Sequence, residues 1–199
     1  MKKILISAVL TLLISGGIAM ADPQEAPVLW FSDFSPTGTS SYMTRLDDMV
    51  LVTLEATGLN PGDAVTLWWI VFNNPAGCTP PMCGDDEFDD ETGAKLAAAE
   101  VGVANATGNV VKSDGSLEFG ATLHQGMNDP EHQVVFNAGF EGASVLTVEP
   151  AYAEIHLVVQ SHGQGRGGKK LREQLAYLEA NCTPACADVQ FAVHAPTAP

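Results

Sequence analysis

The sequence predicts a mainly β protein: a single antiparallel β-sandwich domain with one flanking α-helix and two small disulfide loops. Short stretches rich in β-branched and apolar residues recur along the chain, and turn-forming residues separate them, as in sandwiches and barrels. Four cysteines form two closely spaced pairs. A hydrophobic content of 46% with 17% charged residues is ordinary for a globular chain.

Residues 1–21 have the pattern of a secretory signal peptide. A positive start at Lys2 and Lys3 precedes an apolar run over residues 4–14, and Ala19-Met20-Ala21 is a small-residue cleavage site. An N-terminal anchor is the alternative, but the apolar run is shorter than the roughly 20 residues of a membrane span. We therefore expect residues 22–199 to be one secreted domain, periplasmic or extracellular, without a transmembrane segment.

The charge balance restricts the class of partner. The chain has 24 acidic and 9 basic side chains and a formal charge of −15. Nucleic-acid binding needs a basic surface that neutralises phosphates. The composition therefore excludes nucleic acid and leaves the partner open, with a protein or a surface as candidates.

The cysteines predict two local disulfides in an oxidising compartment. Their spacing pairs Cys78 with Cys83 and Cys182 with Cys186, and prolines within both loops favour turns that bring the ends together. Four cysteines allow three connectivities. A zinc site with four thiolate ligands is the alternative, because both spacings are close to those of zinc knuckles.

Residues 64–73 are apolar on both alternating faces, which predicts a strand in the middle of a sheet, covered on both sides. Residues 22–36 are expected to form an extended arm or a first edge strand, and 94–100 a short helix. The other predicted strands are 49–57, 101–111, 116–124, 133–136, 143–148, 153–161 and 187–194.

A second helix is predicted over residues 168–180, where Leu171, Leu175 and Leu178 form an apolar stripe. Basic residues crowd its beginning, although the helix dipole disfavours cations there. With the preceding glycine-rich stretch they form a candidate anion site, the alternative being a flexible connection. The candidate residues are Arg166, Lys169, Lys170 and Arg172.

The acidic run over residues 85–91 is a candidate calcium site, because Ca²⁺ prefers several oxygen ligands from a flexible loop. Counted from Asp85, the sixth position is not glycine and the twelfth is not glutamate, so the run departs from the helix-loop-helix calcium signature. A solvated loop is the alternative, and docking onto the basic cluster at 166–172 is a third. The candidate ligands are Asp85, Asp86, Asp89 and Asp90.

Two histidine-bearing strands provide a candidate zinc or copper site. Period-2 alternation places Glu154 and His156 on the polar face of one strand, and Asp188 and His194 on the polar face of the other. If the strands are neighbours, imidazoles and carboxylates that suit Zn²⁺ or Cu²⁺ would converge. Histidines hydrogen-bonded in a polar patch are the alternative.

The segments TLWWIVFNNPAGC (66–78), AEIHLVVQSHG (153–163) and CADVQFAVH (186–194) together resemble a group of uncharacterised secreted bacterial proteins. The resemblance covers residues 62–194 and implies no established activity. The histidine-containing strand is also similar to that of chordin-type extracellular β-domains.

No nucleophile elbow and no phosphate-binding fingerprint is present, so the sequence selects no enzyme class. We therefore expect a non-enzymatic binding or structural domain whose ligand contacts lie on loops around a rigid sheet. The alternative is a metal-binding protein or metalloenzyme that uses His156 and His194 with a nearby carboxylate.

Overall fold

A computed structural model describes residues 22–126, 134–139 and 144–198 of the chain. The predicted signal peptide, residues 1–21, lies outside the described residues. In the described part of the chain, no helix is long and apolar enough to cross a membrane.

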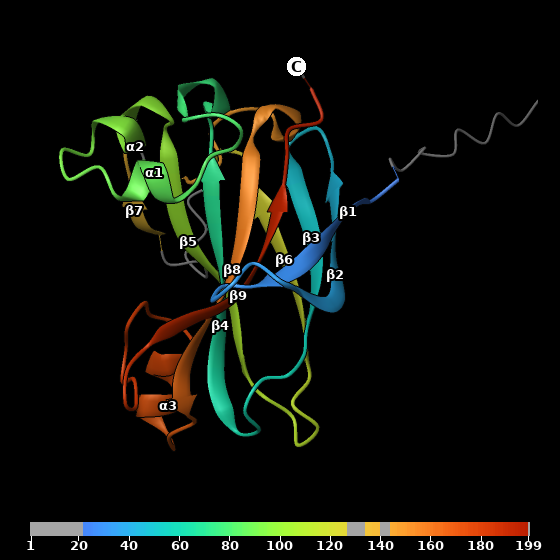
Figure 1. The fold of residues 1–199 in the computed structure, drawn as a ribbon, viewed down its shortest axis with the longest axis vertical. Helices are drawn as coiled ribbons and strands as arrows, with labels where there is room; N and C mark the ends of the chain where they lie inside the picture. The colour runs from blue at the N-terminus through green and yellow to red at the C-terminus, as the bar shows by residue number, and fades with distance from the viewer. Residues whose placement is uncertain (1–21, 127–133, 140–143, 199) are drawn as a thin grey trace, which may run out of the picture.

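Nine antiparallel strands form one curled sheet with the spatial order β6-β3-β2-β1-β9-β8-β4-β5-β7 (Figure 1). The sheet curls so far that β5 and β6 also come into contact, which gives it a sandwich-like cross-section. The predicted mainly β fold is thereby confirmed. The strands are β1 (Gln24–Trp30), β2 (Pro36–Arg45), β3 (Met49–Ala56), β4 (Asp63–Phe72), β5 (Val101–Val110), β6 (Leu117–His124), β7 (Val134–Asn137), β8 (Glu154–Gln164) and β9 (Ala187–His194).

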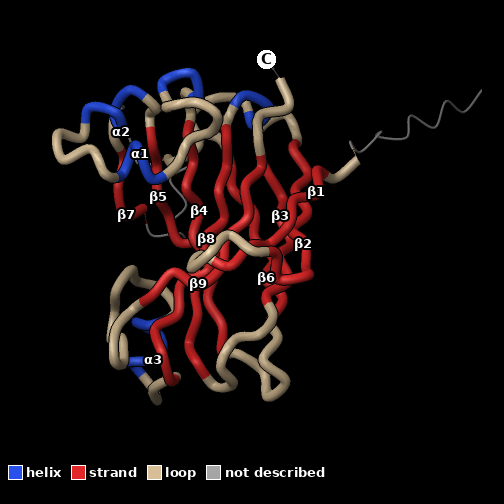
Figure 2. The backbone as a smooth tube through the Cα atoms, viewed as in Figure 1, coloured by secondary structure: helices blue, strands red, loops and turns tan. Residues whose placement is uncertain are grey.

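The helical segments are short and lie at the two ends of the sheet (Figure 2). The connection from β4 to β5 carries η1 (Pro75–Gly77), α1 (Asp85–Phe88) and α2 (Ala94–Ala98) at one end. At the other end, α3 (Lys169–Gln174) lies between β8 and β9. The 3-10 helix η2 (Pro150–Tyr152) precedes β8 and lies at the same end as α1 and α2, because Glu154 of β8 pairs with Phe72 at the end of β4.

The inner, concave face of the sheet holds the main core. Large side chains from opposite halves of the curl pack there without contact with solvent, among them Leu54, Leu67, Trp69 and Ile155. Burial of apolar surface on this scale is the dominant favourable contribution to folding.

A second, smaller core lies on the outer face, because β4 is apolar on both sides as predicted. Leu67 and Trp69 point to the inner core, whereas Trp68 and Phe72 belong to a separate outer cluster with Val158 of β8. β4 lies between β8 and β5, in agreement with the predicted central position. The loop carrying the first cysteine pair and α2 cover part of this outer face.

The structure departs from the sequence prediction in two strands. β2 was not predicted, because its serines and threonines leave only Ser41 and Met43 buried. The predicted strand over 143–148 is wrong for its described part: Val145 and Leu146 are buried, but the chain there is not a strand. The side chain of Asn73 bonds the backbone of this segment, so those groups do not pair with another strand.

The predicted helix over 168–180 is shorter than expected and ends with Gln174. The buried amide of Gln174 donates to backbone carbonyls of neighbouring segments instead of facing solvent. Glu179 and Asn181 then take the left-handed backbone conformation, which an α-helix cannot contain. The predicted helix over 94–100 is confirmed as α2.

A buried polar cluster fastens the end of β9 to the inner face. The Arg45 guanidinium donates to the carbonyls of Ala153 at 3.0 Å, His194 at 3.0 Å and Ala195 at 3.1 Å. His194 Nε2 lies 2.9 Å from the Ser41 hydroxyl oxygen. Burial lowers the pKa of His194 to about 4, and the positive charges of Arg45 and His156 act in the same direction.

This pKa predicts an acid-dependent loss of stability. The unfolded imidazole takes up a proton below its ordinary pKa of 6.5, whereas the folded one stays neutral until about 4. The free energy of unfolding should therefore fall by about 3 kcal/mol between pH 6.5 and 4 through this residue alone. Denaturant unfolding measured between pH 6.5 and 4 checks this prediction. His194→Gln should remove this decrease in the free energy of unfolding, whereas His124→Gln on β6 should retain it.

Candidate binding groove

A groove of about 870 Å³ lies on the outer face of the sheet, between the β4–β5 connection and the turn after β1. Its floor comes from four neighbouring strands, β1, β9, β8 and β4. The floor side chains are apolar: Leu29, Ile70, Val158, Phe191 and Val193. A cavity of this size is within the range of small-molecule sites in proteins.

Aromatic rings form one wall of the groove. Phe31 and Phe34, in the turn after β1, both make edge-to-face contacts with Phe191, at ring-centre distances of 5.7 and 5.5 Å. Phe34 is 57% exposed and has a left-handed backbone with φ of 57°. A bulky residue rarely adopts this conformation, and such outliers concentrate at functional sites.

The opposite wall is the first disulfide loop with α1, and two buried carboxylates hold it in place. Glu87 accepts the backbone N–H groups of Thr79 at 2.8 Å and Gly84 at 2.7 Å. Glu154, at the start of β8, accepts the backbone N–H of Cys83 at 3.0 Å. The loop is therefore fixed against the sheet as well as closed on itself.

His156 contributes the imidazole that lines the groove. Its Nε2 lies 2.8 Å from Glu154 Oε1, and its ring is tilted against Phe72 with the ring centres 4.9 Å apart. The carboxylate accepts the hydrogen on Nε2 and fixes the orientation of the ring. The groove thus contains one oriented imidazole in an apolar setting.

The rim of the groove is acidic. Asp85, Asp86 and Asp188 line it, and no lysine or arginine does so among the described residues. Burial by the surrounding chain raises the pKa of Asp188, the amide of Gln160 opposes this shift, and the negative charge of Glu179 adds to it. The rim therefore favours a positive charge.

A second cavity of about 320 Å³ adjoins the groove and shares Ile70, Phe88, Val158 and Asp188 with it. It extends along the outer face toward the segment after α3, where Leu178 lines it. A ligand longer than the groove therefore has an apolar continuation along the sheet.

The two predicted disulfides are confirmed: Cys78 pairs with Cys83 and Cys182 with Cys186. The first pair belongs to the loop before α1, the second to the segment after α3, at opposite ends of the sheet (Figure 1). This arrangement excludes the alternative of one zinc ion bound by all four cysteines.

The strand register corrects the predicted pairing of His156 with His194. β8 and β9 are neighbours as assumed, but His156 lies opposite Val193, and His194 lies opposite Ile155. Opposite residues share a face, so His156 belongs to the outer face and His194 to the inner core. Of the four predicted ligands, only Glu154 and His156 are brought together; Asp188 accepts from Gln160 instead.

The structure does not gather the predicted calcium ligands around one point. Asp85, Asp86 and Asp89 are exposed. Asp90 accepts backbone N–H groups of Thr92 and Lys95 within its own loop. In the described residues, one group of at least three histidine, cysteine or acidic side chains has ligand atoms within 4.8 Å of one another: His162, Cys182 and Cys186.

The predicted anion-binding residues lie apart from the groove, around α3. Arg166 donates to the Thr183 hydroxyl, and Lys169 forms an ion pair with Glu173 at 3.3 Å. Lys170 and Arg172 are exposed. Across the described residues the acidic loop makes no ion pair with this cluster, so the docking of one on the other is not observed.

Sequence reasoning missed the aromatic residues that make the groove. Phe31 and Phe34 were within a segment expected to be an arm, and Phe88 was within the acidic run. The signal was the aromatic content of both segments, but sequence periodicity cannot tell that Phe31 and Phe34 contact Phe191 or that Phe88 contacts Phe72. Comparison with family models, curated proteins and solved structures finds no match to this chain.

The carboxylate of Glu87 is expected to stabilise the disulfide loop that forms the wall of the groove. Burial alone would raise its pKa, but the hydrogen bonds from Thr79 and Gly84 outweigh burial and lower it. Its stabilising effect is therefore present above the ordinary pKa and is lost as the pH falls through the lowered value.

At pH 7, Glu87→Gln should destabilise the protein by about 1–3 kcal/mol, because an amide accepts one N–H where the carboxylate accepts two. Thermal unfolding measures this change. Glu91→Gln is the control, because it removes the same charge from an exposed part of the loop. Equal stability of the two variants would contradict the structural role of Glu87.

Proposed function

We propose that the protein is a secreted binding domain that takes a small, largely apolar ligand in the groove on the outer face of its sheet. The groove itself carries this proposal: about 870 Å³ between a rigid apolar floor, an aromatic wall and a disulfide-closed loop. Small-molecule sites in proteins have this combination of apolar lining and a few placed polar groups.

The ligand is expected to carry a positive charge. Carboxylates occupy the rim at Asp85, Asp86 and Asp188, and ring faces on the aromatic wall also attract cations. The acidic excess of the whole chain adds a long-range attraction of the same sign. An organic cation with an apolar body therefore matches both the floor and the rim.

Binding is favoured over catalysis by how the polar groups of the groove are engaged. Among the described lining residues, Thr79 has the only hydroxyl, and it interacts with Glu87 rather than with His156. Cys83, the lining cysteine, is in a disulfide. A base oriented by a carboxylate is present, but a nucleophile within its reach is not among these residues.

Secretion is part of the proposal and rests on the sequence of residues 1–21 together with two disulfides. Disulfides form and persist in oxidising compartments. The resemblance to uncharacterised secreted bacterial proteins agrees with this compartment and stays a prediction.

The proposal is tested by calorimetric titration of the protein with 4-phenylbutylamine, 4-phenylbutanol and 4-phenylbutyrate. These probes share one apolar body and differ in charge. The amine should bind most tightly, the neutral alcohol less tightly and the carboxylate least. Absence of saturable binding by all three, or a preference for the carboxylate, would refute a cation-binding groove.

Phe34→Ala should weaken binding of the amine by about two- to tenfold, because an edge-to-face aromatic contact contributes roughly 0.5–1.5 kcal/mol. The side chain is exposed, so the fold should be preserved. Tyr152→Ala is the matched control, since Tyr152 is also an exposed aromatic residue but lies outside the groove. Equal affinities of the two variants would place the ligand elsewhere.

A further inference from the structure

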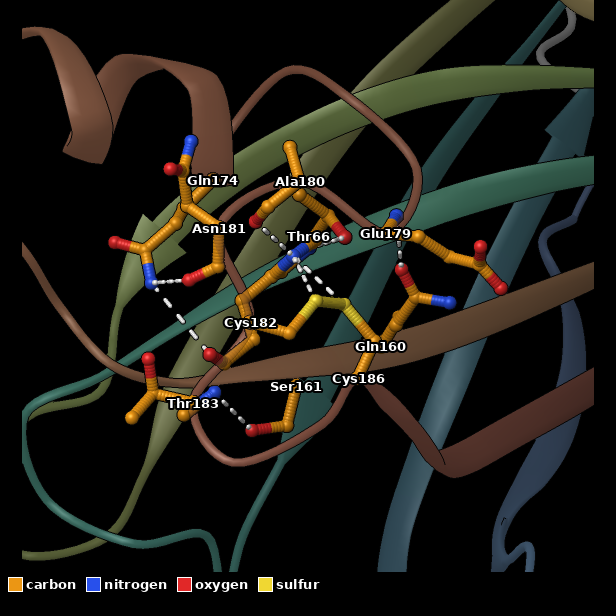
Figure 3. The surroundings of a disulfide bond; sticks show 12 residues. Thr66, Gln160, Ser161, Gln174, Glu179, Ala180, Asn181, Cys182, Thr183 and Cys186 are labelled. Carbon is orange, nitrogen blue, oxygen red and sulfur yellow. Dashed lines mark hydrogen bonds between the residues drawn. A yellow bond between two sulfur atoms is a disulfide. The ribbon is translucent and has the colours of Figure 1, made fainter.

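His162, near the end of β8, lies beside the second disulfide and does not line the groove. Its side chain is fully buried, and the Cys182–Cys186 bridge lies directly against its ring. Figure 3 shows this bridge and the hydrogen bonds around it. Both cysteines are only partly buried.

The two nitrogen–sulfur distances at this bridge are close to those of a metal site. His162 Nδ1 lies 3.3 Å from Cys186 Sγ and 3.8 Å from Cys182 Sγ. An ion with metal–sulfur bonds of about 2.3 Å and metal–nitrogen bonds of about 2.0 Å holds its nitrogen and sulfur ligands about 3.5–3.7 Å apart. The ligand set requires that the disulfide opens and that His162 Nδ1 gives up its hydrogen bond to the Ala180 carbonyl.

In the disulfide state the imidazole is satisfied without a metal. Trp68 Nε1 donates to Thr66 Oγ1 at 2.7 Å, and Thr66 Oγ1 lies 3.0 Å from His162 Nε2. His162 Nδ1 lies 3.2 Å from the carbonyl oxygen of Ala180, its acceptor. Burial lowers the pKa of His162, although the hydrogen bond to the Ala180 carbonyl opposes this shift.

The segment that carries the cysteines is held to the sheet by contacts that do not depend on the sulfur–sulfur bond. The backbone N–H of Thr183 donates to the His162 carbonyl at 3.0 Å. The buried Gln174 amide donates to the carbonyls of Gln164 and Asn181 at 3.2 and 3.3 Å. On the other side of the loop, Ala187, which follows Cys186, pairs with Ser161 of β8. We therefore expect both sulfur atoms to stay next to His162 after reduction.

We propose that the reduced protein binds one Cu⁺ ion through His162 Nδ1, Cys182 Sγ and Cys186 Sγ. A dithiol donates two electrons and two protons: the Cys182–Cys186 bond breaks, both cysteines become thiols, and the dithiol leaves as its own disulfide. Cu⁺ then displaces the two thiol protons to solvent. The imidazole proton is exchanged from Nδ1 to Nε2, where Thr66 Oγ1 accepts it.

The ligand set suits copper(I), because thiolates are soft ligands. Zinc bound by two cysteines and one histidine takes a fourth ligand such as water. The described residues place three side-chain ligands here, and the experiment below therefore compares the two ions. Thr66 fixes the ring from its other nitrogen, as outer hydrogen-bond partners do at metal-bound histidines.

The experiment uses the full secreted domain with Cys78→Ser and Cys83→Ser, so that Cys182 and Cys186 are the only thiols. The protein is reduced with a phosphine, freed of the reductant under nitrogen, and titrated with Cu⁺ against a chromogenic Cu⁺ chelator. We expect one Cu⁺ per reduced chain and none for the oxidised chain. X-ray absorption should find two sulfur ligands and one nitrogen ligand.

His162→Gln should weaken Cu⁺ binding about tenfold or more, because glutamine keeps a polar atom near Thr66 but removes Nδ1. His124→Gln, on the edge strand β6, should bind as the parent does. Circular dichroism of each variant confirms folding before titration. If the serine background does not fold, the same titration and absorption spectrum are recorded on the fully reduced native sequence.

Three results would overturn the proposal. Cu⁺ binding of equal strength by the oxidised chain would show that the disulfide plays no part. A spectrum without a nitrogen ligand, or unchanged affinity in folded His162→Gln, would remove the histidine from the site. If the reduced chain bound one Zn²⁺ in a parallel titration but bound no Cu⁺, the site would be a zinc site and not a copper site.

Discussion

The burial of β4 and β8 on both faces is the constraint on which the rest of the structure depends. Their inner residues, such as Leu67 and Leu157, are covered by the curl of the sheet itself. Their outer residues, such as Trp68 and Val158, need cover from elsewhere, because a buried strand cannot leave large apolar side chains in water. The β4–β5 connection with its disulfide, and the segment around α3, provide that cover at the two ends of the sheet.

The two covering segments leave the middle of the outer face open, and this open part of the sheet is the floor of the groove. Glu154 illustrates how the scaffold and the groove share residues, because one carboxylate oxygen holds both the disulfide loop and the imidazole of His156. The two disulfides then differ in their surroundings. Cys83 packs into the apolar outer cluster, whereas Cys182 and Cys186 lie against a buried histidine.

Much of the fold could be predicted from the sequence, because β-branched alternation and the two-sided apolar pattern of residues 64–73 report burial directly. The cysteine pairing followed from spacing. The site could not be predicted in the same way. Whether His156 and His194 share a face depends on the β8–β9 register, in which His156 faces Val193. The proximity of Phe34 to Phe191, or of His162 to Cys186, likewise depends on contacts between distant segments.

The position of β9 between β1 and β8 has a consequence for the order of assembly. The first and last strands of the described chain are hydrogen-bonded neighbours, with Leu29 opposite Phe191. The pairing of β1 with β9 joins residues very far apart in the sequence, so it is expected to form slowly and late in folding. A ribosome, which releases the chain from its N-terminus, must deliver nearly all of it before the floor of the groove can form.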